Sequence, residues 1–117
     1  MLKCYLPHSF IAILVFEFIT QFFTHHLTPM IRHCVHFFGN VQGVGFRYTT
    51  CSVARGFDVT GFVRNCSNGS VELVAEGESA EIERFLESLR DRMGDHIEQE
   101  ESVVEGASGE FGGFGIR

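Results

Sequence analysis

The sequence lacks the features by which several large classes of protein are recognised. No stretch of about 20 apolar residues is free of charge, as a membrane-spanning helix requires. The four cysteines form no Cys-x-x-Cys pair, so we interpret them as free thiols and expect a cytoplasmic protein without a disulfide framework. Only 9 Lys and Arg accompany 15 Asp and Glu, and the net charge of -6 disfavours nucleic acid as a partner.

What is present describes one globular domain preceded by an extension. Apolar residues make up 44% and charged residues 21% of the 117 positions, values typical of a folded protein and not of a disordered or fibrous one. This length is too short for two ordinary cores. Because Pro29 interrupts the chain, we place an N-terminal extension at residues 1–29 and the folded domain, expected to be a monomer, at residues 30–117.

The extension contains an apolar run over residues 10–23 that is short for a membrane helix and includes Glu17. A secretory signal would need a small-residue cleavage site, and none follows the run. Three interpretations therefore stay open. The segment is either sequence that is translated from an early start codon, with Met30 as the functional start, or a weak membrane-associating or signal segment, or a helix added to the domain.

The rest of the chain alternates between strand and helix patterns. The first helix has an apolar face and a glycine stop at Gly56, and the second begins with Ser79 as its expected cap and ends at Gly94. The order is β-α-β-β-α-β, an α+β ferredoxin-like split βαβ fold with an antiparallel sheet and two helices on one face. The expected strands are residues 31–38, 59–65, 70–76, 97–104 and 111–116, and the expected helices are residues 46–57 and 79–93.

Several details of this pattern can be checked against a structure. The Asn68-Gly69 pair predicts a hairpin because both residues tolerate positive φ, and Gly77 is expected to close the strand that follows. The outer face of the second helix offers pairs such as Glu87 with Arg90. The acidic strand over residues 97–104 is expected near a sheet edge. The apolar helix faces are Phe46, Thr50, Val53, Ala54 and Phe57, and Ile82, Phe85, Leu86, Leu89 and Met93.

The segment Gly39–Arg47 joins the first strand to the first helix. Its glycines allow positive φ and a close approach of the backbone to a ligand. Unpaired N–H groups at the positive end of a helix bind anions, and Arg47 in the first helical turn can add a bidentate guanidinium. The segment therefore predicts an oxyanion cradle, although a glycine-rich turn with a solvated arginine has the same spacing.

The sequence predicts no metal site. On a strand with a period of two, His33 and His36 point to opposite faces and cannot ligate one ion together. His25 and His26 lie in the extension, and His96 stands alone.

Two stretches of the chain resemble the two signatures of the acylphosphatases, which hydrolyse the mixed anhydride of a carboxylic acid and phosphoric acid. The first is Gly-Asn-Val-Gln-Gly-Val-Gly-Phe-Arg at residues 39–47, and the second is Gly-Phe-Val-Arg-Asn-Cys-Ser-Asn-Gly-Ser-Val at residues 61–71. They occur in the order of that family, and the resemblance covers residues 31–117. Asn68 stands where an acidic residue is common, a change that is compatible with a turn.

The resemblance implies a site and a reaction. Arg47 and Asn65 would be the catalytic pair, with Arg47 and the loop amides holding the phosphate and Asn65 orienting the attacking water. An oxygen of the bound phosphate would help to take the proton from that water, and neither metal nor cofactor is implied. The substrate would be a small acyl phosphate. The phosphate-binding residues would be Val41, Gln42, Gly43, Val44, Gly45, Phe46 and Arg47.

Each of these residues also has a structural alternative. Asn65 could cap its own backbone before the turn, Gln42 could hydrogen-bond to the loop backbone, and Arg64 is expected to face solvent or form a salt bridge. Cys51 and Cys66 lie near the signatures, but no activating cation or base accompanies them, so packing roles are expected.

Other functions share the predicted topology. RNA-binding modules display aromatic residues on their central strands, but the acid excess and the missing basic-aromatic strand motif argue against one. A ferredoxin-like regulatory domain that binds a small molecule is the main alternative, since a fold does not determine a function. The acylphosphatase-like module of a hydrogenase maturation factor would continue into Cys-x-x-Cys zinc motifs, which this sequence does not contain.

Overall fold

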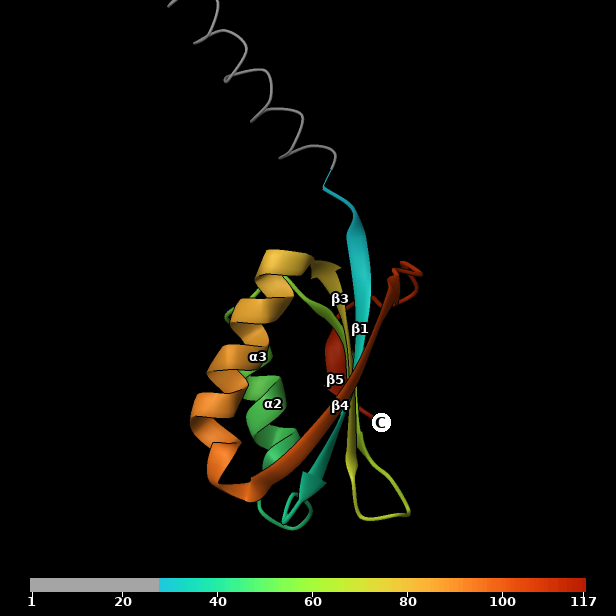
Figure 1. Cartoon of the computed structure of the whole chain (residues 1–117). Helices are drawn as coiled ribbons and strands as arrows, with labels where there is room; N and C mark the ends of the chain where they lie inside the picture. Colours follow the sequence, from blue (N-terminus) through green and yellow to red (C-terminus); the bar gives the residue numbers. More distant parts are fainter. Residues whose placement is uncertain (1–27) are drawn as a thin grey trace, which may run out of the picture.

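A computed structural model describes residues 28–117 (Figure 1). The predicted extension at residues 1–29 lies outside the described residues except for Thr28 and Pro29, and its three interpretations stay open. Within the described part of the chain, no helix is both long and apolar enough to span a membrane.

Five strands form one sheet in the order β4-β1-β3-β2-β5. All neighbouring strands are antiparallel except β2 and β5, which are parallel. The order of the first four strands and the two helices between them confirm the predicted ferredoxin-like α+β fold. The acidic strand β4 lies at one edge, as predicted, and β5 forms the other. The elements are β1 (Met30–Gly39), α2 (Phe46–Ala54), β2 (Thr60–Asn65), β3 (Val71–Glu78), α3 (Ser79–Met93), η1 (Gly94–His96), β4 (Ile97–Gly106) and β5 (Phe114–Ile116).

Both helices cover the same face of the sheet, and the core fills the space between them and the strands (Figure 1). Strand alternation sends every second side chain of β1 toward the helices, which buries Val35 and Phe37. The predicted apolar faces are confirmed, except that Phe57 lies beyond the end of α2 and is only half-buried. Burying each large side chain contributes about 1.5–3 kcal/mol. The buried residues of the two helices are Phe46, Thr50, Val53 and Ala54, and Ile82, Phe85, Leu86, Leu89 and Met93.

Two local predictions were wrong for identifiable reasons. Gly77 does not close β3, because it pairs with Ile31 inside the ladder. A Cβ at Gly77 would lie 2.9 Å from the Asp58 carbonyl oxygen, so the glycine permits a close backbone approach. Ser79 is the first residue of α3 and not its cap, since Glu78 holds the cap position without a side-chain bond.

Side-chain pairing and turn conformation also differ from the local patterns. Arg90 pairs with Glu100 of β4 through Nε contacts of 3.1 and 2.9 Å to its two oxygens, and not with Glu87. The hairpin predicted from Asn68-Gly69 is present, but only Gly69 has a positive φ, of 89°. The final strand is limited to Phe114–Ile116 because the preceding residues cross the outer face of the sheet, where Phe111 packs edge-on against Phe62.

Glu76 holds this crossing segment in place. Its side chain is only 3% exposed and accepts hydrogen bonds from Arg32 Nε at 2.7 Å and from the backbone N–H groups of Ser108 and Gly109 at 2.9 Å. The Ser108 hydroxyl donates a further bond of 3.0 Å to it. Burial by itself would raise the pKa of Glu76, but these donors outweigh it and lower the pKa from 4.5 to about 2. Glu76 thereby fixes the path from β4 to β5.

The lowered pKa of Glu76 predicts a specific acid sensitivity. Because the folded value lies below the unfolded one, the stabilisation is complete above about pH 4.5 and is lost as the pH falls toward about 2. We expect Glu76→Gln to lower the free energy of unfolding at neutral pH by about 1–3 kcal/mol and to flatten its pH dependence in that window. Urea titrations across the window measure both effects.

Glu87→Gln is the matched control, because Glu87 is exposed on α3. This variant should retain the acid profile of the unaltered protein. An unchanged acid profile in Glu76→Gln would contradict the assigned role of Glu76.

Candidate active site

The loop between β1 and α2 is shaped by two glycines. Gly43 and Gly45 both have φ of 78°, in the left-handed region that other residues adopt only with strain. Gly45 is the residue before α2, and its carbonyl accepts the first helical hydrogen bond from Thr49 N–H at 2.9 Å. The next residue, Phe46, is 2% exposed, and its ring lies 5.1 Å from that of Phe37. The start of the helix is therefore anchored in the core.

The loop leaves a row of backbone donors without partners. Within residues 28–117, none of the N–H groups of residues 41–48 donates a hydrogen bond to another protein group, and the first to do so is that of Thr49. The last of these residues form the first turn of α2, where the helix dipole is positive. Such an arrangement binds an anion.

These donors border a hollow of about 160 Å³, where the loop meets the ends of β2 and β5. Arg47 and Asn65, which are 18 positions apart in the sequence, line it together. In the described part of the chain, neither side chain forms a hydrogen bond or an ion pair, so both can act on a bound molecule. The lining residues are Val41, Gly43, Gly45, Phe46, Arg47, Tyr48, Asn65 and Ile116.

Two of the residues predicted to hold phosphate do not line the hollow. Val44 is half-buried and packs against the core. Gln42 points to the β2–β3 hairpin, where its Nε2 donates to the carbonyl oxygens of Cys66 at 2.8 Å and Ser70 at 2.9 Å. Gln42 therefore joins the glycine loop to the hairpin. The expected alternative was a hydrogen bond from Gln42 to the loop backbone. The supporting role is similar, but the carbonyl groups that Gln42 contacts belong to the second signature.

The hollow also includes two residues that sequence reasoning missed. Tyr48 follows Arg47 in the first turn of α2 and is 74% exposed at the rim. Its position beside the signature is a signal that could have identified it. Ile116 comes from β5, and only the parallel pairing of β5 with β2 brings it beside the loop. No local pattern predicts that contact.

Asn65 and its neighbour Arg64 have different surroundings. Arg64 extends on the outer face of the sheet, where its Nε donates to Glu72 Oε1 at 2.9 Å, which confirms the expected salt bridge. Asn65 does not cap the turn as its structural alternative suggested. Asn68 does so, because its Oδ1 accepts hydrogen bonds from Ser70 N–H at 3.0 Å and from the Ser70 hydroxyl at 2.6 Å.

The nearby thiol of Cys51 is poorly suited to nucleophilic attack. Burial raises its pKa, and the neighbouring positive charge of Arg55 offsets this only in part. A thiol with a raised pKa is largely protonated at neutral pH and is a weak nucleophile. The packing role expected for Cys51 agrees with its contact with the core.

The bonds of Gln42 predict that the loop and the hairpin stabilise each other. We expect Gln42→Ala to lower the free energy of unfolding by about 1–3 kcal/mol, because two hydrogen bonds are lost and two carbonyl groups are left without these donors. Urea unfolding measures the change. Gln99→Ala on β4 is the control, since Gln99 makes one exposed contact of 3.3 Å to Glu101. Equal effects of the two substitutions would show that Gln42 does not couple the segments.

Comparisons with known proteins point to one family. A family model described as acylphosphatase matches residues 34–116. An acylphosphatase of Yersinia pseudotuberculosis is 51% identical over 53 residues, which span 45% of this chain and 58% of that protein. One from Clostridium acetobutylicum is 37% identical over 75 residues, or 64% of this chain and 80% of that protein. The crystal structure of an acylphosphatase from Bacillus subtilis matches with a TM-score of 0.66 at 25% identity, covering 74% of this chain and 98% of that one.

Proposed function

The chain belongs to the acylphosphatase family, and from this premise we propose that it hydrolyses acyl phosphates to a carboxylate and inorganic phosphate. The observation that carries the proposal is the hollow in which unpaired loop amides, Arg47 and Asn65 meet. The net charge of -6 works against an anionic substrate at long range, so the attraction must come from these local donors.

The phosphate group of the substrate binds to the loop amides and to the guanidinium of Arg47. Both supply donors that are in place before the substrate arrives, which is the arrangement that stabilises charge developing in a transition state. The acyl group extends toward the rim, where Tyr48 and Ile116 present partly exposed side chains.

The Asn65 carboxamide orients a water molecule for in-line attack on phosphorus. The new P–O bond forms as the bond from phosphorus to the acyl oxygen breaks, and the carboxylate leaves. A phosphate oxygen accepts the proton released by the water. Because the carboxylate is a good leaving group, positioning and charge stabilisation are enough, and hydrolysis requires neither metal nor cofactor.

We also propose a cytoplasmic, monomeric enzyme that does not bind nucleic acid. Cys34, Cys51 and Cys66 are free thiols in the described part of the chain, which suits a reducing compartment. The division into an extension at residues 1–29 and a catalytic domain at residues 30–117 belongs to the same proposal.

Arg47→Ala should lower kcat/KM for benzoyl phosphate by at least about 10³, because the loss of one preorganised donor already costs about 10²–10³. Arg84→Ala is the matched control, since Arg84 is exposed on α3 and pairs with Glu81 at 2.9 Å. The control should keep full activity. Turnover by Arg47→Ala within tenfold of the unaltered protein would refute the role of Arg47.

Asn65→Ala should slow turnover without weakening the binding of phosphate. We expect the inhibition constant of inorganic phosphate to stay within about threefold while kcat falls by about 10² or more, because the side chain acts on the water and not on the phosphate. Steady-state assays with phosphate as a competitive inhibitor measure both quantities. Weakened phosphate binding with normal turnover would show that Asn65 binds the phosphate, the role proposed for Arg47, and does not orient the water.

A further inference from the structure

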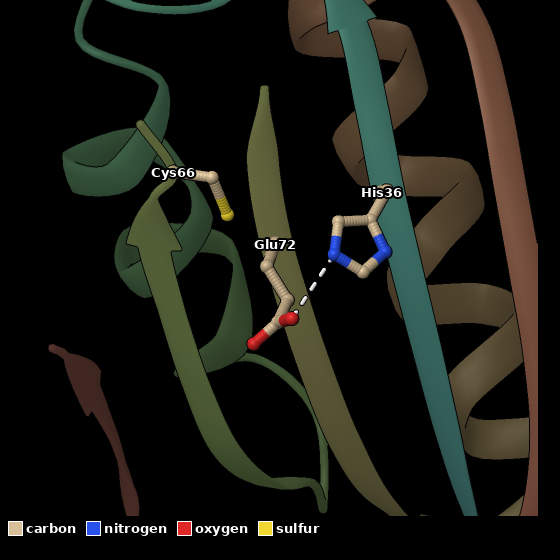
Figure 2. Close-up of side chains that lie close together, drawn as sticks. All are labelled: His36, Cys66 and Glu72. Carbon is tan, nitrogen blue, oxygen red and sulfur yellow. Dashed lines mark ion pairs between the residues drawn. The ribbon is translucent and has the colours of Figure 1, made fainter. Parts of the chain in front are cut away.

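The outer face of the sheet carries a second group of chemically reactive side chains, away from the hollow. Figure 2 shows His36 of β1, Glu72 of β3 and Cys66, which directly follows β2. Strand pairing creates this group, because His36 and Glu72 are register partners and Cys66 lies at the end of the strand on the other side of β3. None of the three side chains lines the hollow.

The three side chains converge on one point. One potential ligand atom of each lies within 4.8 Å of those of the other two, and His36 Nε2 is 3.0 Å from Glu72 Oε2. Figure 2 shows the Cys66 thiol and the His36 ring on either side of the Glu72 carboxylate. Around a tetrahedral zinc ion, ligand atoms at 2.0–2.3 Å from the metal are separated by roughly 3.5 Å. The widest separation in the group, up to 4.8 Å, exceeds that spacing by about 1.3 Å, so a bound zinc ion would draw the ligand atoms together.

We propose that His36, Cys66 and Glu72 form a zinc-binding site on the outer face of the sheet. Thiolate sulfur, imidazole nitrogen and carboxylate oxygen are the ligand types that zinc uses, and a water molecule completes the fourth position. The histidine spacing within β1 predicted no metal site, since His33 lies on the opposite face. The ligands instead come from three neighbouring segments of the sheet.

The surrounding charges set the strength of this site. Glu101 of β4 pairs in register with His36 and adds a negative charge that favours a cation. Arg64 opposes it, because its Nε holds the other oxygen of Glu72 at 2.9 Å and brings a positive charge beside the ligands. Arg64 therefore competes with zinc for Glu72, and its removal should strengthen binding.

Zinc titration of the reduced full-length protein, in competition with a chromogenic chelator, tests the proposal. We expect Cys66→Ser and His36→Gln each either to lose one equivalent of bound zinc or to bind it with an affinity that is lower by at least about tenfold. The matched control is Cys34→Ala, since Cys34 is another half-buried free thiol on β1 and is not part of the group. Cys34→Ala should bind as the unaltered protein does.

Cobalt substitution gives a readout for the thiolate itself. A sulfur-to-cobalt charge-transfer band in the near ultraviolet should appear in the unaltered protein and in Cys34→Ala, and disappear in Cys66→Ser. Binding that survives both Cys66→Ser and His36→Gln would place the metal elsewhere, for example on the histidines of the extension, and would overturn the proposal. The absence of zinc binding by the unaltered protein would overturn it as well.

Arg64→Ala keeps the test decisive if the ligand variants do not fold. All three ligands remain in this variant, and we expect its zinc affinity to exceed that of the unaltered protein. Unchanged or weaker binding would contradict the assignment of Glu72 as a ligand.

Discussion

The two bonds from the Gln42 side chain hold together the parts from which the site is built. The glycine loop supplies backbone donors and Arg47, and the β2–β3 hairpin supplies Asn65. Gln42 spans the gap through Nε2 contacts of 2.8 and 2.9 Å to the Cys66 and Ser70 carbonyl oxygens. A hydrogen bond between a loop and a turn specifies their separation more narrowly than apolar packing does, because it depends on both distance and angle. The position of Asn65 relative to Arg47 therefore depends on a residue that does not line the hollow.

The two faces of the sheet carry different kinds of side chain. The face beneath the helices is largely apolar, and it fixes the start of α2 through Phe46, whose ring packs against Phe37. The outer face carries two groups of charged and polar side chains, one formed by Glu76, Arg32 and Ser108 and the other by Glu72, Arg64 and His36. The hollow lies at the end of the sheet where the loop after β1 and the ends of β2 and β5 meet. The charged side chains of the outer face named above and the donors that line the hollow therefore lie in different parts of the molecule.

Much of this architecture could be predicted from the sequence because local patterns determined it. The apolar stripe of α3, the buried alternation of β1 and the glycine loop each follow from periodicity or from backbone freedom. Contacts between distant segments could not be predicted in the same way. The partner of Arg90 is Glu100 and not Glu87, and Gln42 reaches carbonyl groups of the hairpin, because these contacts depend on how the strands are ordered. The same limit applies to Ile116, which enters the hollow only through the pairing of β5 with β2.

The short edge strand β5 forms one wall of the hollow. Its position relies on three register pairs with β2, on backbone bonds such as Arg117 N–H to the Val63 carbonyl at 3.0 Å, and on the segment that Glu76 secures. A short edge element of this kind opens locally at a lower free energy than the central strands, and its amide hydrogens exchange with solvent first. If the chain acts as proposed, fraying of β5 would widen the hollow beside Ile116 and leave the loop donors in place, so the room for the acyl group would depend on how often this strand opens.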